Sequence, residues 1–184
     1  MPLFLLYLVL IAILITSILF CIVSIYILFI LFFTRVPFVR TPKKVIQKIL
    51  EEIDIKSSHV VYDLGCGDAK FLIAVEKATG AKTIGFELSP WAYLLAKLNI
   101  FFKKSKTKVY YKNFYKENLS KADLVFCFLI DSVMSKVGRQ LEQQLKKGAT
   151  VISFAFAIPN WIPIKEIKPF SNKKNSSKIY IYQR

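Results

Sequence analysis

The chain has 184 residues, and its 27 Lys and Arg against 12 Asp and Glu give a formal net charge of +15. A single histidine and three cysteines without a CxxC pair exclude the usual zinc sites and the histidine-assisted nucleophiles. The positive excess favours a polyanionic neighbour, such as an anionic membrane surface or nucleic acid, unless it reflects only a lysine-rich composition.

Residues 1–34 contain no charged side chain and predict one transmembrane helix, because a bilayer core needs only about 20 apolar residues. A cleaved signal peptide is disfavoured, since the apolar run is too long and has neither a basic start nor a small-residue cleavage site. Basic residues follow the run before the first acid, Glu51. The positive-inside rule therefore predicts a single-pass membrane protein whose main domain is cytoplasmic, or in the matrix if the membrane is the mitochondrial inner one.

Residues 35–57 predict a basic juxtamembrane segment that contains an amphipathic helix. Thr41 suits the N-cap of this helix and Pro42 its first turn. One face of the helix carries Val45, Ile46, Ile49 and Leu50.

Residues 58–184 predict a single α/β domain in which strands and helices alternate. Strands are expected at 59–64, 82–87, 108–112, 123–129, 149–157 and 178–182, and helices at 68–79, 90–102 and 132–147, with Gly80 and Gly148 as stops and Ser89 as a start. Continuous apolar strands favour a mostly parallel, Rossmann-like sheet with helices on both faces. The segment 113–122 is too short for a full crossover helix, and "SNKKNSSK" at 171–178 predicts a loop.

The stretch "VYDLGCGDAKF" predicts a ligand-binding turn after the first strand. It lacks the third glycine of a dinucleotide fingerprint and the Gly-Lys-Ser/Thr of a P-loop, and Asp63 would repel a pyrophosphate. S-adenosylmethionine fits better, because it has no phosphate and carries a positive sulfonium and an ammonium. Asp63 would face its methionine part, the amides of the turn its carboxylate, and Glu87 both hydroxyls of its ribose. The alternative is structural: Asp63 caps the turn, Cys66 fills space and Glu87 is an exposed strand end.

The stretch from Val61 to Ile100 resembles motif I and the acidic loop of class I S-adenosylmethionine-dependent methyltransferases. The runs "FVRTPKKVIQKIL", "GFELSPW", "NFYK" and "FAFAIPNWIP" are similar to the small membrane-anchored protein-lysine methyltransferases of the ATP synthase c-subunit and adenine nucleotide translocase type, with their bacterial relatives. The resemblance implies a cofactor site formed by Asp63, Gly65, Cys66, Gly67, Asp68, Glu87, Leu88, Asn113 and Phe114.

Three positions depart from the pattern of that family. Ala69 replaces the third glycine, which still permits close packing, and Asn113 replaces an acid but keeps a hydrogen-bonding group for adenine. The fourth strand ends in "FLID" where the family tends to have a glycine and a proline, so the substrate pocket is the part in doubt.

Methyl transfer needs alignment and a neutral nucleophile more than it needs an acid or a metal. Asp131, Asn160 and Trp161, with Phe154 and Phe156, follow the fourth and fifth strands and are predicted to border the methyl acceptor. The alternative is that these aromatic residues pack in the core and Asp131 starts a helix.

The function expected from this pattern is methylation of a lysine of a neighbouring membrane protein, with the membrane contacted by the N-terminal helix and a basic face at 103–112. Methylation of a lipid or small apolar acceptor and a non-catalytic binding module stay open. Nucleic acid is not an expected partner, because there is no appended binding domain and no N/D-P-P-aromatic motif after the fourth strand. No metal is expected.

Overall fold

The protein is described here by a computed structural model that covers residues 3–34, 39–170 and 177–184. It has two compact units, Met1–Pro37 and Phe38–Arg184. The first unit is the helix α1 (Leu3–Thr34), in which the stretch Leu3–Phe29 is long and apolar enough to cross a membrane.

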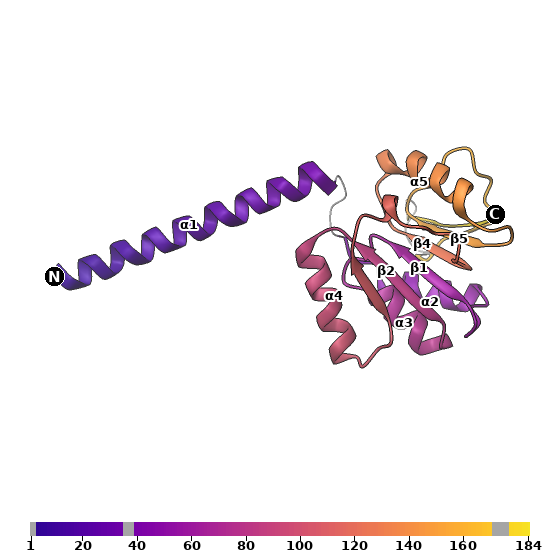
Figure 1. Ribbon diagram of the computed structural model, residues 1–184, viewed down its shortest axis with the longest axis horizontal. Coiled ribbons are helices and arrows are strands. Elements are labelled where there is room, and N and C mark those ends of the chain that lie inside the picture. The colour runs from indigo at the N-terminus through magenta and orange to yellow at the C-terminus, as the bar shows by residue number, and fades with distance from the viewer. Residues whose placement is uncertain (1–2, 35–38, 171–176) are drawn as a thin grey trace. The chain divides into compact units, whose positions relative to one another are not determined.

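The second unit is an α/β domain whose elements alternate as the sequence predicts (Figure 1). In chain order they are α2 (Lys43–Glu52), β1 (Val60–Leu64), α3 (Lys70–Thr79), β2 (Lys82–Glu87), α4 (Pro90–Phe102), β3 (Lys108–Tyr111), the 3-10 turn η1 (Phe114–Lys116), β4 (Leu124–Cys127), α5 (Asp131–Gln144), β5 (Thr150–Phe154), β6 (Lys165–Ile167) and β7 (Ile179–Gln183).

The seven strands form one sheet in the order β3-β2-β1-β4-β5-β7-β6. Strands β1 to β5 are parallel, and β7 is antiparallel to both of its neighbours. This arrangement confirms the Rossmann-like prediction. The strand β6 was not predicted, because it has only three residues and two of them are exposed lysine and glutamate side chains.

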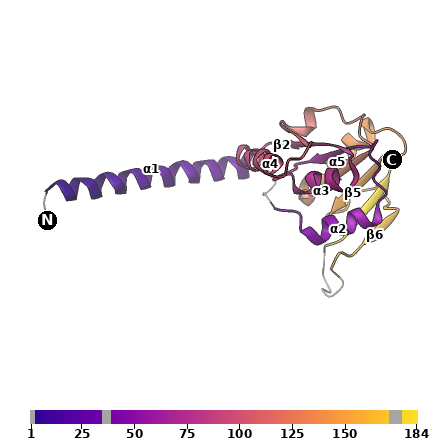
Figure 2. The same cartoon turned by 90° about the horizontal axis from the view of Figure 1, so that it is seen from below.

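Helices cover both faces of the sheet, with α2 and α3 on one face and α5 on the other (Figures 1 and 2). On the first face the ring of Phe71 in α3 stacks on Phe126 of β4, with centroids 4.0 Å apart. Val45, Ile46 and Ile49 of α2 belong to the same core, as the predicted apolar face requires. On the other face α5 buries Met134, Val137 and Leu141.

Several predicted ends shift by a few residues, for local reasons. Pro42, not Thr41, is the N-cap of α2, and its carbonyl accepts bonds from the N–H groups of Val45 and Ile46. α5 ends at Gln144, four residues before the predicted stop at Gly148, and β5 ends at Phe154 because Ala155 has φ +75°. The reduced turn between β3 and β4 is present as η1. Residues 171–176 of the predicted polar loop lie outside the described residues.

Candidate active site

The turn after β1 is built from three left-handed residues. Gly65, Gly67 and Ala69 have φ values of +81°, +55° and +60°. Glycine reaches this region without strain, whereas alanine does not. A Cβ on Gly65 would also lie 3.1 Å from Leu129 Cδ2. The third motif position therefore demands a strained backbone from Ala69 as well as the close packing expected for it.

The backbone N–H groups of this turn are mostly bonded within the protein. Those of Gly65 and Cys66 donate to the carbonyl of Phe86 at 2.9 and 3.0 Å, and that of Ala69 donates to the carbonyl of Cys66 at 2.9 Å. The N–H of Gly67 donates to Glu87 Oε2 at 2.8 Å. Between Gly65 and Lys70, the N–H of Asp68 is the one without an acceptor among the described residues. Few amides of the turn are therefore left to meet a ligand.

Glu87, at the end of β2, ties two turns together. Its Oε2 accepts the bond from Gly67, and its Oε1 accepts bonds from the N–H groups of Leu88 and Ser89 at 2.8 and 2.7 Å. The side chain is buried, so it is not an exposed strand end. Burial raises the pKa of the carboxyl group, and the three backbone bonds oppose that rise.

Asp63 lies beside Glu87 but is not bonded in the same way. It is 3% exposed, and no described residue donates a hydrogen bond to its carboxylate. Burial raises the pKa of Asp63 well above its ordinary value, and the nearby carboxylates of Glu87 and Asp68 raise it further. A buried carboxyl group without a donor is costly, and a positively charged ligand would offset that cost.

Asp68 already has two cationic partners within the protein. Its Oδ2 lies 3.2 Å from Arg40 Nε and 2.9 Å from Lys70 Nζ, and Asn99 Nδ2 donates to its carbonyl at 2.9 Å. The ion pair between Lys70 and Asp68 could be predicted from the sequence, because the two residues are only two positions apart. Arg40 and Asn99 could not, because they come from the segment before α2 and from α4.

The remaining residues predicted for the cofactor differ in placement. Cys66 Sγ packs against β2, 2.6 Å from where a Cβ on Gly85 would lie, and burial raises the pKa of its thiol well above the ordinary value. Leu88 is exposed directly after Glu87. Asn113 Oδ1 caps η1 by accepting a bond from Tyr115 N at 3.0 Å, and the carbonyl of Phe114 accepts one from Gln140 Nε2 at 2.9 Å.

The residues predicted for the acceptor side follow the adjacent strands β4 and β5 and differ in their surroundings. Asp131 is exposed at the first position of α5, and Asn160 is exposed with φ +67°. The indole of Trp161 lies against Gly138 of α5 and meets the ring of Tyr182 edge-on at 5.7 Å. Gly138 is seven residues after Asp131, which is about 10 Å along a helix. Trp161 therefore packs along the sheet, some distance from Asp131.

The two predicted phenylalanines differ in burial. Phe154 is buried, with its ring 4.7 Å from that of Phe128, whereas Phe156 is half-buried. The carbonyl of Phe156 accepts a bond from Ser153 Oγ at 2.6 Å.

A polar cluster between η1 and α5 was not predicted. Tyr115 Oη and Gln140 Oε1 are buried with no hydrogen-bond partner among the described residues, and Lys136 Nζ lies 4.2 Å from the centroid of the Tyr115 ring. Burial raises the pKa of the neighbouring Cys127 thiol to about 12, so that thiol stays protonated. In the sequence, these positions are unremarkable members of a turn, a helix and a strand.

Comparisons with known proteins identify the family of this chain. The family model described as the ANTKMT methyltransferase domain matches residues 63–165. A protein-lysine N-methyltransferase of Saccharolobus islandicus is 33% identical over 153 residues, which cover 80% of this chain and 93% of the relative. The chain belongs to the ANTKMT methyltransferase family. The adenine nucleotide translocase lysine N-methyltransferase of Mus musculus is 30% identical and matches 71% of this chain, which spans only 57% of that relative.

A solved structure of a methyltransferase has a similar fold. An RNA methyltransferase from Salinibacter ruber, crystallised with S-adenosyl-L-homocysteine, matches with a TM-score of 0.73 and 27% identity, covering 79% of this chain and 93% of that chain. The chain is thus an S-adenosylmethionine-dependent methyltransferase. The buried, donor-free carboxyl group of Asp63 suits this cofactor, because the cofactor is positively charged. Among the described residues, no group of three His, Cys, Asp or Glu side chains could hold a metal ion.

Proposed function

We propose that this chain is a membrane-tethered protein-lysine N-methyltransferase whose substrate is a membrane protein. The observation that carries the proposal is the pair of buried carboxyl groups at the turn, of which Glu87 has its donors and Asp63 has none. The lysine acceptor is supported by the names of the relatives from Saccharolobus islandicus and Mus musculus. The membrane is supported by the apolar helix α1.

The two acids have different roles in holding the cofactor. Asp63 interacts with the positive charge of its methionine part, and Glu87 keeps both turns in place and offers its one remaining acceptor position, on Oε2, to a ribose hydroxyl. Gly65 and Gly67 let the backbone approach closely, and Asp68 N–H is available to the cofactor carboxylate. Cys66, Leu88, Asn113 and Phe114 shape the walls of the same site.

When bound, the cofactor supplies a methyl group on a positively charged sulfur. The lysine ammonium first loses a proton to solvent, and its nitrogen then forms the new C–N bond as the C–S bond breaks. The protein contributes alignment, which is worth roughly 7 to 11 kcal/mol in favourable cases. Asp131 and Asn160 border the acceptor, and Trp161 supports the segment that carries Asn160 through its contact with α5.

The placement in the membrane extends this proposal to the whole chain. Residues 1–34 anchor the protein as one transmembrane helix, residues 35–57 form the basic juxtamembrane segment, and residues 58–184 form the methyltransferase domain on the cytoplasmic or matrix side. Such a tether confines the enzyme to acceptors in the same membrane.

A second candidate is RNA methylation, which the name of the Salinibacter ruber relative favours. Against it stands the end of β4, where "FLID" replaces the motif expected of an enzyme that methylates exocyclic amines of bases. The lysine proposal rests on two relatives that are at least 30% identical, whereas the RNA reading rests on one at 27%.

The test incubates the full chain and its own membrane fraction with methyl-labelled S-adenosylmethionine. We expect label in a membrane protein, at a lysine located by mass spectrometry, and none with Asp63→Asn. Asp54→Asn makes the same change in charge at an exposed position and should label normally. Label in the lipid extract or in RNA would replace the protein acceptor, and absence of cofactor binding by the folded chain would favour a non-catalytic module.

A further inference from the structure

The helix α4 is turned so that its small residues face the sheet and its large apolar residues face outward. Ala92 and Ala96 are its buried residues. The outward residues, which we call the α4 face, are Trp91, Leu94, Leu98, Phe101 and Phe102, with 57%, 49%, 43%, 76% and 75% of their surface exposed. A surface helix of a soluble domain normally has the opposite arrangement.

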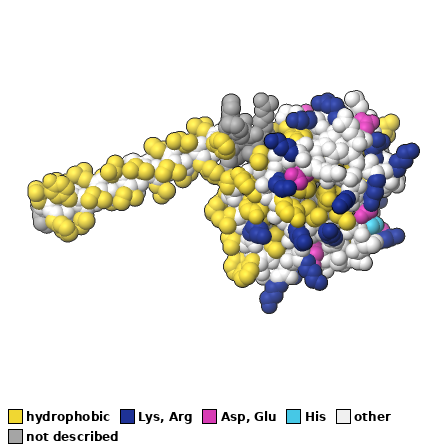
Figure 3. All heavy atoms as spheres, in the orientation of Figure 1, with side chains coloured by type: hydrophobic (Ala, Val, Ile, Leu, Met, Phe, Trp, Pro, Cys, Tyr) yellow, Lys and Arg dark blue, Asp and Glu magenta, His cyan; other side chains and the backbone are white. Residues whose placement is uncertain are grey.

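These residues form a cluster rather than a scatter of single exposed side chains. Of the eleven exposed large apolar residues in the described part of the second unit, eight lie between Leu88 and Tyr111. Figure 3 shows hydrophobic side chains gathered over the region of α4, with Lys and Arg around them. Contiguous exposed apolar patches of this kind mark interaction sites.

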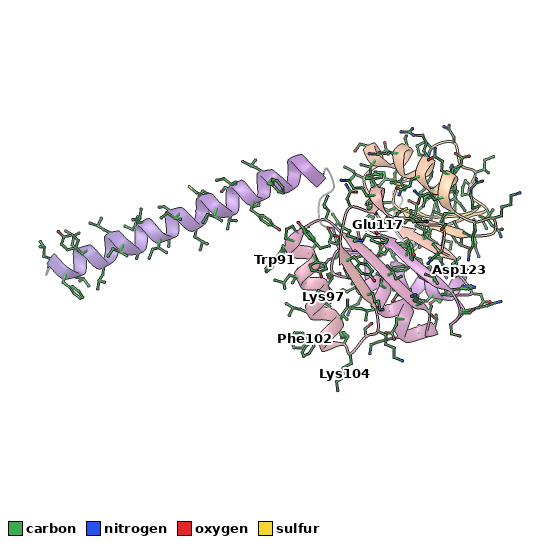
Figure 4. The ribbon with its side chains drawn as sticks, viewed as in Figure 1. Trp91, Lys97, Phe102, Lys104, Glu117 and Asp123 are labelled. Carbon is green, nitrogen blue, oxygen red and sulfur yellow. The ribbon has the colours of Figure 1, made fainter. Side chains whose placement is uncertain are left out.

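The segment that carries the α4 face has charge of one sign. Residues 90–112 contain no Asp or Glu. Five lysines of this segment are exposed and form no ion pair with a described acid: Lys97, Lys103, Lys104, Lys106 and Lys108. In Figure 4, Trp91 and Phe102 point away from the sheet, with Lys97 between them along α4 and Lys104 beyond its end. Large apolar side chains bordered by lysines are typical of helices that lie in the plane of an anionic membrane surface.

We propose that the α4 face and its five lysines dock the domain onto an anionic lipid surface, with α4 lying in the interface. The inference rests on the membrane attachment proposed above and adds a second contact to it. The apolar side chains enter the boundary between headgroups and acyl chains, and each lysine near the headgroups raises the equilibrium constant for docking about fivefold.

The covalent connection makes this contact reachable. Eight residues, 35–42, separate the end of α1 from the start of α2. Such a chain spans at most about 26 to 29 Å, so a domain tethered by α1 stays close to the bilayer. The high effective concentration given by a short tether lets a weak surface contact be occupied.

Docking by α4 would also place the candidate site at the membrane surface. α4 begins at Pro90, three residues after Glu87, and Leu88 and Trp91 are exposed at that end. The carboxyl ends of β1 and β2, which carry Asp63 and Glu87, would then lie near the headgroups. The candidate site could then reach a lysine of a membrane protein that lies at the membrane surface.

The test uses the full chain in lipid nanodiscs and reads the position of Trp91 by fluorescence. The chain has two tryptophans, so Trp161→Phe leaves Trp91 as the reporter and Trp91→Phe leaves Trp161. With lipids brominated near the headgroup end of the acyl chains, we expect the emission of Trp91 to fall about twofold in anionic discs, because an interfacial helix lies 5–10 Å into the boundary. The emission of Trp161 should not change. If Trp161→Phe does not fold, the emission of the wild type minus the emission of Trp91→Phe gives the emission of Trp91.

The lysines are tested by Lys103→Gln together with Lys104→Gln, which should lower the equilibrium constant for docking in anionic discs by about tenfold or more. Trp91 unquenched in discs that carry the chain would overturn the inference and leave the proposed function standing. Two chains in one disc that shield Trp91 from the lipid would also overturn the inference, because the α4 face would then bind a second copy. A chain that does not co-elute with the discs would overturn the proposed anchoring and this inference together.

Discussion

Two carboxyl groups of the candidate site, at neighbouring strand ends, differ in what the fold provides for them. Glu87 has three backbone donors, whereas Asp63 is buried with none among the described residues. The first therefore holds the structure together, and the second is costly in its ionised form unless a cationic ligand offsets it. Substitution of Glu87 should therefore destabilise the protein, whereas substitution of Asp63 should stabilise it and weaken ligand binding.

Asp63→Asn is expected to stabilise the ligand-free protein toward neutral pH. The unfolded carboxyl group ionises near its ordinary pKa, while the raised pKa in the folded state keeps the proton to higher pH. Stability is therefore full below the ordinary pKa and is lost as pH rises toward the raised one, by about 1 kcal/mol for each pH unit crossed. Melting temperatures of both proteins across pH would show the curves diverging as pH rises.

The same substitution should weaken cofactor binding about tenfold to a hundredfold, because it removes a charged partner. Calorimetric titration measures this loss. Asp54→Asn, at an exposed position, should change neither quantity. An Asp63→Asn protein that binds the cofactor as tightly as the wild type would remove Asp63 from the site.

Asp131→Asn should slow methyl transfer about tenfold to a hundredfold at saturating cofactor, if the carboxylate aligns the acceptor. Cofactor affinity should not change, because Asp131 starts α5 after β4, whereas the cofactor turn follows β1. Ser132→Ala, at the next exposed position, is the matched control. Equal turnover of Asp131→Asn and wild type would leave Asp131 as a helix start only.

At the scale of elements, the ends of β1 and β2 and the starts of α3 and α4 depend on one side chain. Glu87→Gln replaces one acceptor oxygen by an amide group, so at least one buried N–H loses its partner. We expect the free energy of unfolding to fall by about 1 to 3 kcal/mol. Denaturant titration of this variant, next to the exposed Glu51→Gln, measures the effect. A loss no larger than that of the control would mean that the three bonds contribute little.

Gly85 of β2 is required for a steric reason rather than a conformational one. A Cβ there would lie 2.6 Å from Cys66 Sγ and 2.7 Å from Leu72 Cδ1. Gly85→Ala should therefore destabilise the protein by about 1 to 3 kcal/mol through overpacking. Gly148→Ala meets no atom within 4 Å but forces alanine to φ +82°, and should cost only about 1 kcal/mol. Thermal unfolding would rank the two, and the reverse order would contradict the packing argument.

The sequence predicts the elements of this fold well, because glycine, proline and apolar runs act locally. Gly80 ends α3 in the left-handed conformation, and Ser89 caps α4 by accepting a bond from Ala92 N. The bonds of the candidate site are less predictable, because they join distant segments. The pairing of Asp68 with Arg40 depends on how the segment before α2 packs against the turn, and the bond from Gly67 to Glu87 depends on how β1 and β2 align in the sheet. Which face of α4 turns toward the sheet is likewise decided by tertiary packing.

At the scale of the whole molecule, the proposed anchor makes a prediction about Cys21. This residue lies near the middle of α1, whereas Cys66 and Cys127 are buried in the domain. If α1 spans the bilayer, a membrane-impermeant thiol reagent should leave Cys21 unlabelled in sealed vesicles of either orientation. After detergent is added, Cys21 should be labelled.

The orientation of the chain in the membrane can be tested with an introduced cysteine. Lys77→Cys places a thiol at an exposed position of α3, and it should react only from the cytoplasmic or matrix side. Labelling of this position from the opposite side would reverse the topology. Labelling of Cys21 without detergent would show that α1 does not span the membrane.

The order of the strands also bears on how such enzymes diversify. The candidate residues from Asp63 to Leu88 lie at or just after the ends of β1 and β2, while Asp131 and Asn160 follow β4 and β5 in the other half of the sheet. If Asp131 and Asn160 border the acceptor as proposed, mutations that remodel the second half would retarget the enzyme without disturbing the first. A lineage can thus inherit its methyl donor intact while its acceptors change from one descendant to the next.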